Sequence, residues 1–222
     1  SEAHLNIDWD TLGLDAKAGD WAEYTLPDVF KDVTMAAKPI ELKDGTIVGE
    51  YVVENGKVKF IFNEEIEKGK VKNGSLELNF EFDLDKFADE IKKDIYLNDK
   101  IGDPITITVK PKGDFKKIEK SAAIDSDVDT KEIGWSIDVL NTGDKPVDGK
   151  VTDKFPDGLG TAKDFVVEKI RLGINGDKKV VEVVTPTPVP TKNDATGFEF
   201  NFDDIEPYEG YRIRYKTPIE KF

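Results

Sequence analysis

Hydrophobic and polar residues alternate along several short stretches of this chain. In 75–82, Leu76, Leu78, Phe80 and Phe82 fall on one side and polar residues on the other. A period of two places successive side chains on opposite faces of a β-strand, so each stretch predicts a strand with one buried and one solvent-exposed face. The same alternation is found in 134–140, 197–202 and 211–215.

Turn-forming residues separate these predicted strands. Asn55 and Gly56 lie between 51–53 and 57–62, and both tolerate the positive φ that a tight hairpin requires. Similar turn sequences occur at 44–45, 73–74, 142–144 and 175–177. Short strands with turns at this spacing are typical of β-sandwiches.

One segment has a helical period instead. In 84–95, apolar residues recur at helical spacing, and Asp83 or Asp85 is suited to cap the segment. We predict one short helix packed on the edge of the first sandwich.

The length and one irregular segment predict two domains. A chain of 222 residues is long enough for two sandwiches of about 100 residues each. The stretch 105–109 is predicted to be the last strand of the first domain. The basic segment 110–120 that follows contains a proline and a glycine, as a linker would. We therefore predict domains at 1–112 and 113–222. A second irregular stretch, 184–192, reads as an extended loop inside the second domain.

Charge and composition exclude several kinds of function. The formal net charge of -14 repels phosphate backbones and anionic membranes, so nucleic acid is a poor partner. The chain has no cysteine, and its one histidine is His4, which argues against a catalytic triad and a multi-histidine zinc site. No apolar run approaches the roughly 20 residues that span a bilayer. We predict no enzyme activity, no metal and no cofactor.

Several acidic groups have two interpretations. Asp125, Asp127 and Asp129 offer alternate carboxylates suited to calcium, but they lack the glycine and distal glutamate of an EF-hand loop, and a solvated turn is the simpler interpretation. The adjacent carboxylates at 64–65 and 203–204 could form acid–base pairs, yet a chain with 46 acidic residues contains such neighbours by chance.

The three tryptophans are candidate ligand platforms. Trp135 lies on an alternating apolar face and fits the core better, whereas Trp9 and Trp21 flank turns.

A series of short motifs resembles one protein family. The first half has a Gly-Asp turn leading to a strand that ends in Leu-Pro, and the second half has four further motifs in order. These motifs are 19–20 with 24–27, 45–49 with 56–62, 118–122, 132–141 with its tryptophan, 150–155, and 211–218 with its Tyr-Lys-Thr sequence. In order and spacing they resemble the paired N1–N2 ligand-binding region of Gram-positive collagen adhesins, the MSCRAMM class.

This resemblance implies a fold, a function and a location. The fold would be all-β, with two immunoglobulin-like sandwiches in tandem, of the DEv-IgG or collagen-adhesin type. The function would be adhesion at the cell wall, outside the cell, by holding an extracellular-matrix protein such as collagen between the two domains. Phe115, Lys116 and Lys117 are the candidate ligand-binding residues, because an aromatic and two cations lie at the expected junction.

The resemblance also implies a covalent clamp. In this family a lysine on the first strand of the second domain joins an asparagine on the last strand, and an acid on a middle strand promotes this isopeptide bond. Lys120 matches the lysine and Asp153 the acid. The matching asparagine would follow Phe222, so we expect the last strand to be missing, and Asn201 is the nearest late asparagine. An open sheet edge of this kind could accept a strand from another chain.

Two further functions remain open on the sequence. The chain could be a structural stalk or pilin-like spacer stabilised by the isopeptide bond. It could also be a carbohydrate-binding module attached to a secreted enzyme.

Overall fold

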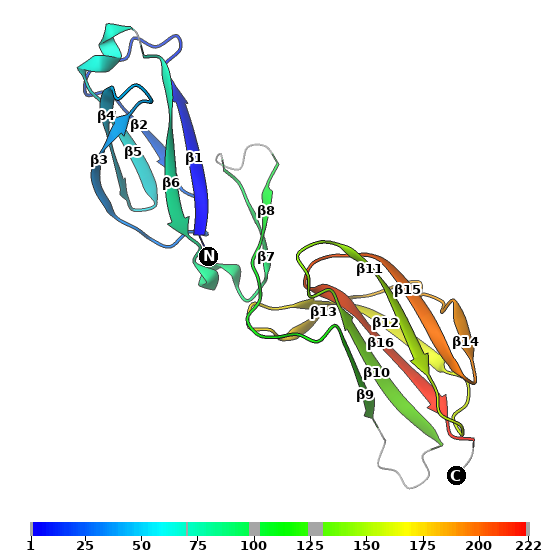
Figure 1. The fold of residues 1–222 in the computed structure, drawn as a ribbon. Helices are drawn as coiled ribbons and strands as arrows, with labels where there is room; N and C mark the ends of the chain where they lie inside the picture. The colour runs from blue at the N-terminus through cyan, green and yellow to red at the C-terminus, as the bar shows by residue number, and fades with distance from the viewer. Residues whose placement is uncertain (1, 70, 98–102, 124–130, 221–222) are drawn as a thin grey trace. The chain divides into compact units, whose positions relative to one another are not determined.

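β-Strands build two separate units along the chain. A computed structural model describes residues 2–69, 71–97, 103–123 and 131–220 (Figure 1). Unit 1 is Ser1–Val109 and unit 2 is Lys110–Phe222, so the structural division lies three residues before the predicted one. Regular structure in the described ranges consists of β-strands and two 3-10 helices, so the prediction of an all-β fold is confirmed.

Unit 1 contains a four-stranded sheet and a long two-stranded ribbon. The sheet has the order β2-β5-β4-β3, and the ribbon pairs β1 with β6 in antiparallel register (Figure 1). These strands are β1 (Glu2–Asp10), β2 (Trp21–Thr25), β3 (Met35–Glu41), β4 (Ile47–Glu54), β5 (Lys57–Phe62) and β6 (Asn73–Glu81). A further hairpin joins β7 (Lys92–Ile95) to β8 (Ile105–Thr108), and η1 (Glu64–Lys68) follows β5.

The core of unit 1 comes from the alternating side chains of these strands. Val48, Val53 and Val58 are fully buried, and Phe60 and Phe80 are nearly so. Because the strands alternate, the residues between them face solvent. The predicted strand 75–82 is confirmed as β6, with Leu78 and Phe80 inside.

The predicted helix over 84–95 is much shorter than expected. Only η2 (Leu84–Phe87) forms a helical turn, capped by the side chain of Asp83. Ala88 and Asp89 then take positive φ angles of 48° and 63°, which end the turn, and Lys92–Ile95 form β7. Phe87, Ile91 and Ile95 are all buried, so the apolar spacing reflects one turn followed by a strand rather than one helix.

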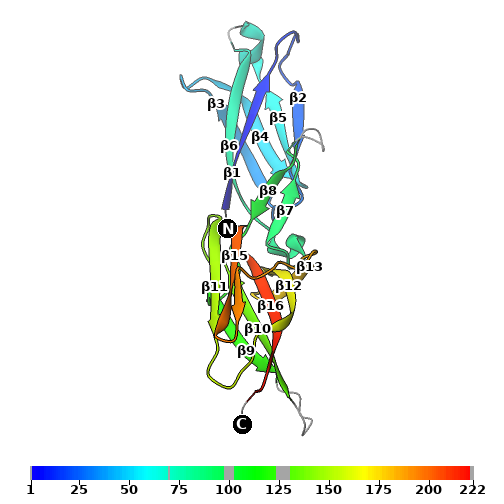
Figure 2. The ribbon, with the colours of Figure 1, turned by 90° about the vertical axis from the view of Figure 1, so that its right-hand side faces the viewer.

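Unit 2 is a sandwich of a five-stranded and a three-stranded sheet. The larger sheet has the order β13-β12-β16-β10-β9 and the smaller one β11-β15-β14; Figure 2 shows β11 and β15 beside β10 and β16. These strands are β9 (Ile118–Ala123), β10 (Glu132–Leu140), β11 (Val147–Lys154), β12 (Lys163–Leu172), β13 (Lys178–Val183), β14 (Lys192–Asp194), β15 (Gly197–Ile205) and β16 (Glu209–Pro218). The predicted extended loop lies between β13 and β14.

Aromatic side chains fill the space between the two sheets of unit 2. Phe198 and Phe200 of β15 are 1% exposed and pack against Ile213 and Tyr215 of β16. The ring centroids of Phe198 and Tyr215 lie 4.7 Å apart in an edge-to-face arrangement, which aromatic pairs favour. The alternation predicted for 134–140, 197–202 and 211–215 is therefore confirmed.

No helix among the described residues is long and apolar enough to cross a membrane.

Removal of one central side chain should destabilise unit 2. Ile213 is fully buried between the sheets, and we expect Ile213→Ala to lower the free energy of unfolding by about 3 kcal/mol, because it leaves a cavity. Val189 is 84% exposed, so Val189→Ala should change the free energy of unfolding by less than about 0.5 kcal/mol. Urea denaturation measures both, and equal effects of the two changes would contradict this packing.

Candidate functional site

The outer face of the five-stranded sheet carries a row of very small residues. Ser121 of β9 lies opposite Ser136 of β10, and Ala123 lies opposite Gly134. These positions alternate with the inward-facing Lys120, Trp135 and Ile137, so the small side chains point away from the core. Small side chains on a sheet leave a depression between their larger neighbours.

Two adjoining hollows occupy this depression, with volumes of about 460 and 440 Å³. We call them together the outer hollow. It crosses β9, β10 and β16, and Ser121, Ser136 and Arg214 line both parts. An open trough of this kind suits an extended ligand better than a small enclosed one.

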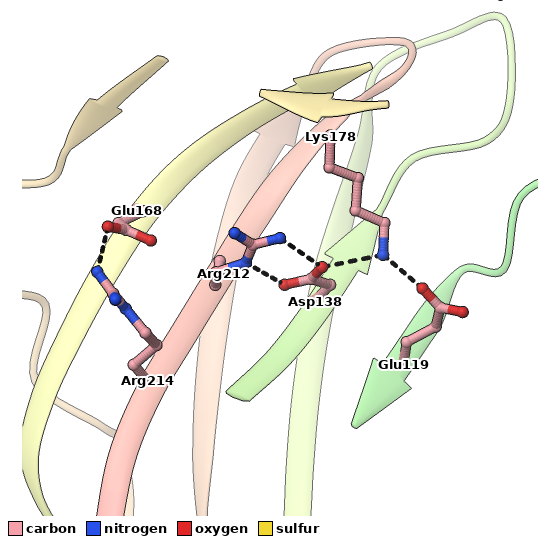
Figure 3. A network of polar contacts seen from close by, with 6 residues as sticks. All are labelled: Glu119, Asp138, Glu168, Lys178, Arg212 and Arg214. Carbon is pink, nitrogen blue, oxygen red and sulfur yellow. Dashed lines mark hydrogen bonds and ion pairs between the residues drawn. The ribbon is translucent and has the colours of Figure 1, made fainter. Parts of the chain in front are cut away.

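Charged side chains border the outer hollow on the same face (Figure 3). Arg212 of β16 donates two hydrogen bonds to Asp138 of β10, with Nε–Oδ1 and Nη2–Oδ2 distances of 2.8 and 3.0 Å. Arg214 forms an ion pair with Glu168 of β12. The Arg214 side chain is 54% exposed, so it can contact a ligand while it is paired with Glu168.

Lys178, the first residue of β13, forms ion pairs with residues of β10 and β9 on this face. Its Nζ lies 2.9 Å from Asp138 Oδ2 and also pairs with Glu119 of β9, although β13 and β9 are opposite edges in the strand order. Figure 3 shows Lys178 reaching over the sheet towards Asp138. The hairpin therefore closes one end of the face.

Asp138 is the centre of this network. Burial raises the pKa of its carboxyl, but the hydrogen bonds and charges of Arg212 and Lys178 outweigh burial, so the pKa lies below its ordinary value. Asp138 is therefore ionised and holds both cations in place.

A second polar cluster connects the two sheets inside unit 2. Lys120 of β9 places its Nζ 2.7 and 2.8 Å from the two carboxylate oxygens of Asp153 of β11. The same Nζ lies 4.3 Å from the ring centroid of Trp135, within cation–π range. The structure thus brings the two clamp candidates together, although the Lys120 side chain is 34% exposed and not enclosed by apolar groups.

Tyr215 completes this cluster from the neighbouring strand. Its hydroxyl donates a hydrogen bond to Asp153 Oδ2, and burial together with the Asp153 carboxylate raises the pKa of Tyr215 well above its ordinary value. Trp135 Nε1 donates to Thr217 Oγ1 over 2.8 Å. The Tyr-Lys-Thr sequence therefore supplies two of the groups that hold the cluster, which the sequence did not reveal.

The other predicted residues are more dispersed. Phe115 packs against a small cluster of Leu140, Ile170 and Leu172, whereas the Lys116 side chain is 79% exposed and the Lys117 carbonyl accepts a backbone hydrogen bond from Leu140. Their ligand-binding role stays a prediction.

Asn201 cannot reach the clamp candidates in this fold. It lies opposite Lys150 on the solvent face of β15, whereas Asp153 and Phe200 face inwards.

The predicted calcium ligands Asp125, Asp127 and Asp129 lie outside the described residues. Among the residues that are described, no group of three or more histidine, aspartate or glutamate side chains is arranged to hold a metal ion.

Sequence reasoning missed the charged border of the outer hollow. Arg212 and Arg214 alternate with the buried Ile213, which marks them as outward-facing, but nothing local indicates their partners. Asp138 and Glu168 come from other strands, and only the sheet order brings them alongside.

We expect Asp138→Asn to lower the free energy of unfolding by about 2 kcal/mol at neutral pH, because two cations lose their shared carboxylate. The folded pKa of Asp138 is depressed, so its contribution is complete above the unfolded pKa of about 3.9 and is lost as pH falls through the lower folded value. Urea denaturation across this pH range should show wild type and variant converging in acid.

Asp164→Asn is the matched control, because Asp164 is 59% exposed and lies 3.7 Å from Lys216. It should change stability by less than about 1 kcal/mol. A pH-independent effect of Asp138→Asn would contradict the ion-pair account.

Comparison with known proteins agrees with an immunoglobulin-like fold. Residues 1–94 match the family model of a bacterial Ig domain. No curated protein sequence is detectably similar to the chain.

Solved structures of bacterial surface proteins resemble nearly the whole chain. The collagen adhesin from S. aureus is 18% identical, with a TM-score of 0.37, over 99% of this chain and 76% of that one. The collagen binding domain of Erysipelothrix rhusiopathiae surface protein RspB is 15% identical, with a TM-score of 0.38, over 98% and 75%. A serine-rich repeat protein from Streptococcus agalactiae is 17% identical, with a TM-score of 0.34, over 98% and 76%.

The match to the family model covers most of unit 1. Over residues 1–94, the first unit of this chain is similar to a bacterial Ig domain.

Proposed function

We propose that this chain is a non-enzymatic adhesin module that binds an extracellular-matrix protein, with collagen as the leading candidate. The observation that carries the proposal is the outer hollow, whose floor is small side chains and whose border is charged. The motif resemblance described above supports the same class of function.

The shape of the outer hollow fits a rod-like ligand. A collagen triple helix is a straight assembly of three extended chains, so it requires a shallow surface that several strands share. The small residues Ser121, Gly134 and Ser136 let a ligand approach the sheet backbone closely. Large side chains at these positions would hold it away.

The charged side chains at the border of the outer hollow are suited to binding a ligand, not to converting it. Arg214 offers an exposed cation, and Asp138, Arg212 and Lys178 are already fixed by one another. Fixed charges of both signs select a ligand that carries complementary charges along its length. Binding then requires no catalytic group and no cofactor.

The proposed location follows from the proposed function. A module that holds a matrix protein works outside the cell, anchored to the wall of a Gram-positive bacterium. The net charge of -14 of the whole chain disfavours nucleic acid as a partner. Pairing of another chain with the open edges of β9 or β11 stays a prediction.

A structural stalk is the second candidate, and the Lys120–Asp153 contact favours it. A lysine amine held beside a carboxyl across two sheets is the arrangement from which an isopeptide clamp could form. In that reaction the neutral amine attacks an asparagine carboxamide, the new amide bond forms, and ammonia leaves. Such a bond would resist pulling forces, which suits a spacer.

Filling the outer hollow should weaken collagen binding. We expect Ser136→Trp to weaken binding to immobilised triple-helical collagen by about tenfold or more, because the indole occupies the floor. Asn201→Trp, on the solvent face of the other sheet, is the matched control and should bind like wild type. Surface plasmon resonance measures both.

If wild type binds neither collagen nor another immobilised matrix protein such as fibrinogen, the adhesin proposal is wrong and the stalk remains. Equal weakening by both tryptophan substitutions would exclude the outer hollow as the binding surface.

The clamp can be tested by mass. In the protein taken from its natural cell surface, the intact mass should be lower than the sequence mass by one ammonia. Lys120→Ala should abolish this loss, and Lys150→Ala, which changes an exposed side chain of β11, should leave it unchanged. A natural protein with its full sequence mass would rule out the clamp.

A further inference from the structure

Unit 1 contains a separate hollow of about 750 Å³ that the proposed function does not use. It lies where β1 ends at Asp10 and β6 begins at Asn73, and the segment 41–44, which starts with the last residue of β3, forms its other wall. We call it the Trp9 hollow. Its size is within the range of sites that bind small molecules or parts of larger ligands.

Trp9 contributes an aromatic surface to this hollow. Its indole lies across Gly74 of the paired strand, where a Cβ would come within 2.5 Å of the ring. The ring also packs against Phe62, with centroids 5.1 Å apart. Gly74 and Phe62 therefore fix a partly exposed tryptophan at the floor of a concave surface.

The border of the Trp9 hollow is rich in hydrogen-bond acceptors. Asp10 and Asp44 are each oriented by a backbone N–H, from Leu12 and Thr46, and these contacts leave further acceptor positions on each carboxylate. Hydrogen bonds from Thr46 hold the pKa of Asp44 below its ordinary value, so the group stays ionised. A ligand that donates hydrogen bonds would pair with these carboxylate oxygens.

One donor in the same place lacks an acceptor. Trp9 Nε1 is buried and has no hydrogen-bond partner within the ranges that the structure describes. A buried unpaired N–H is unfavourable, so a ligand oxygen that pairs with it gains affinity. The nitrogen is covered in the unliganded fold, so pairing requires a small shift of the indole on binding.

We propose that the Trp9 hollow binds a neutral saccharide. A pyranose ring stacks its C–H face on an indole, and its hydroxyls both donate to carboxylates and accept from Nε1–H. Four carboxylates and one cation line the hollow, so phosphate and sulfate groups of anionic glycans are repelled; these residues are Asp8, Asp10, Glu41 and Asp44, with Lys43. A cationic side chain would pair with the carboxylates but would leave Nε1–H unsatisfied.

This site does not depend on the collagen proposal. It uses residues of unit 1, whereas the outer hollow belongs to unit 2. Failure of one proposal therefore leaves the other intact.

The three indole N–H groups allow a direct test by ¹H–¹⁵N NMR of the whole chain. The probes are glucose, galactose, mannose, N-acetylglucosamine and lactose, with a heparin fragment and an arginine-rich peptide as anionic and cationic comparisons. We expect at least one neutral sugar to shift the Trp9 indole signal in a saturable way, while the Trp21 and Trp135 signals stay in place.

Variants at the border separate binding from folding. Asp44→Asn keeps the acceptor for Thr46 N–H but removes the charge, and we expect about tenfold weaker sugar binding. Glu77→Gln, an exposed carboxylate on β6 away from the hollow, should bind like wild type. Trp9→Phe retains a ring beside Phe62 but lacks the N–H, so it should bind more weakly without unfolding.

Three outcomes would overturn the proposal. The first is that no neutral sugar shifts the Trp9 indole signal. The second is that only the arginine-rich peptide shifts it. The third is that Asp44→Asn and Glu77→Gln weaken sugar binding equally.

Discussion

Burial of every second side chain between two sheets is the constraint on which the rest of this protein depends. In unit 2 the inward-facing Phe198, Phe200 and Ile213 leave almost no surface in contact with water. Burial of apolar surface is the main force that holds such a layer pair together. The same period of two forces the residues between them outwards, so packing the core also determines the outer surface.

This alternation separates two kinds of polar group on neighbouring positions. Lys120 points towards the smaller sheet, and its amine, on a side chain that is 34% exposed, finds a partner there. Asp153 supplies that partner, with Tyr215 donating to the same carboxylate. Ser121, one residue later, points the other way and helps to form the floor of the outer hollow. A shift of one residue in register would exchange these roles.

Both candidate binding surfaces arise where a strand lacks a large side chain. Gly134 and Ser136 lower the surface of the five-stranded sheet, and Gly74 allows Trp9 to lie across β6. Neither surface requires a mobile loop or a catalytic group. The described part of the chain therefore presents open surfaces built on strands, which require at most a small side-chain shift on binding, and such pre-organisation favours binding.

The sequence by itself determined the all-β class, most of the strands and the inward direction of Phe198, Ile213 and Trp135, because these follow from a local period of two. It failed at 84–95, where helical spacing came from one turn followed by a strand around Ala88. Only the tertiary structure decided which strands are neighbours. That order, set by packing between residues far apart in the chain, places Lys120 beside Asp153 and Arg212 beside Asp138, and no local pattern encodes it.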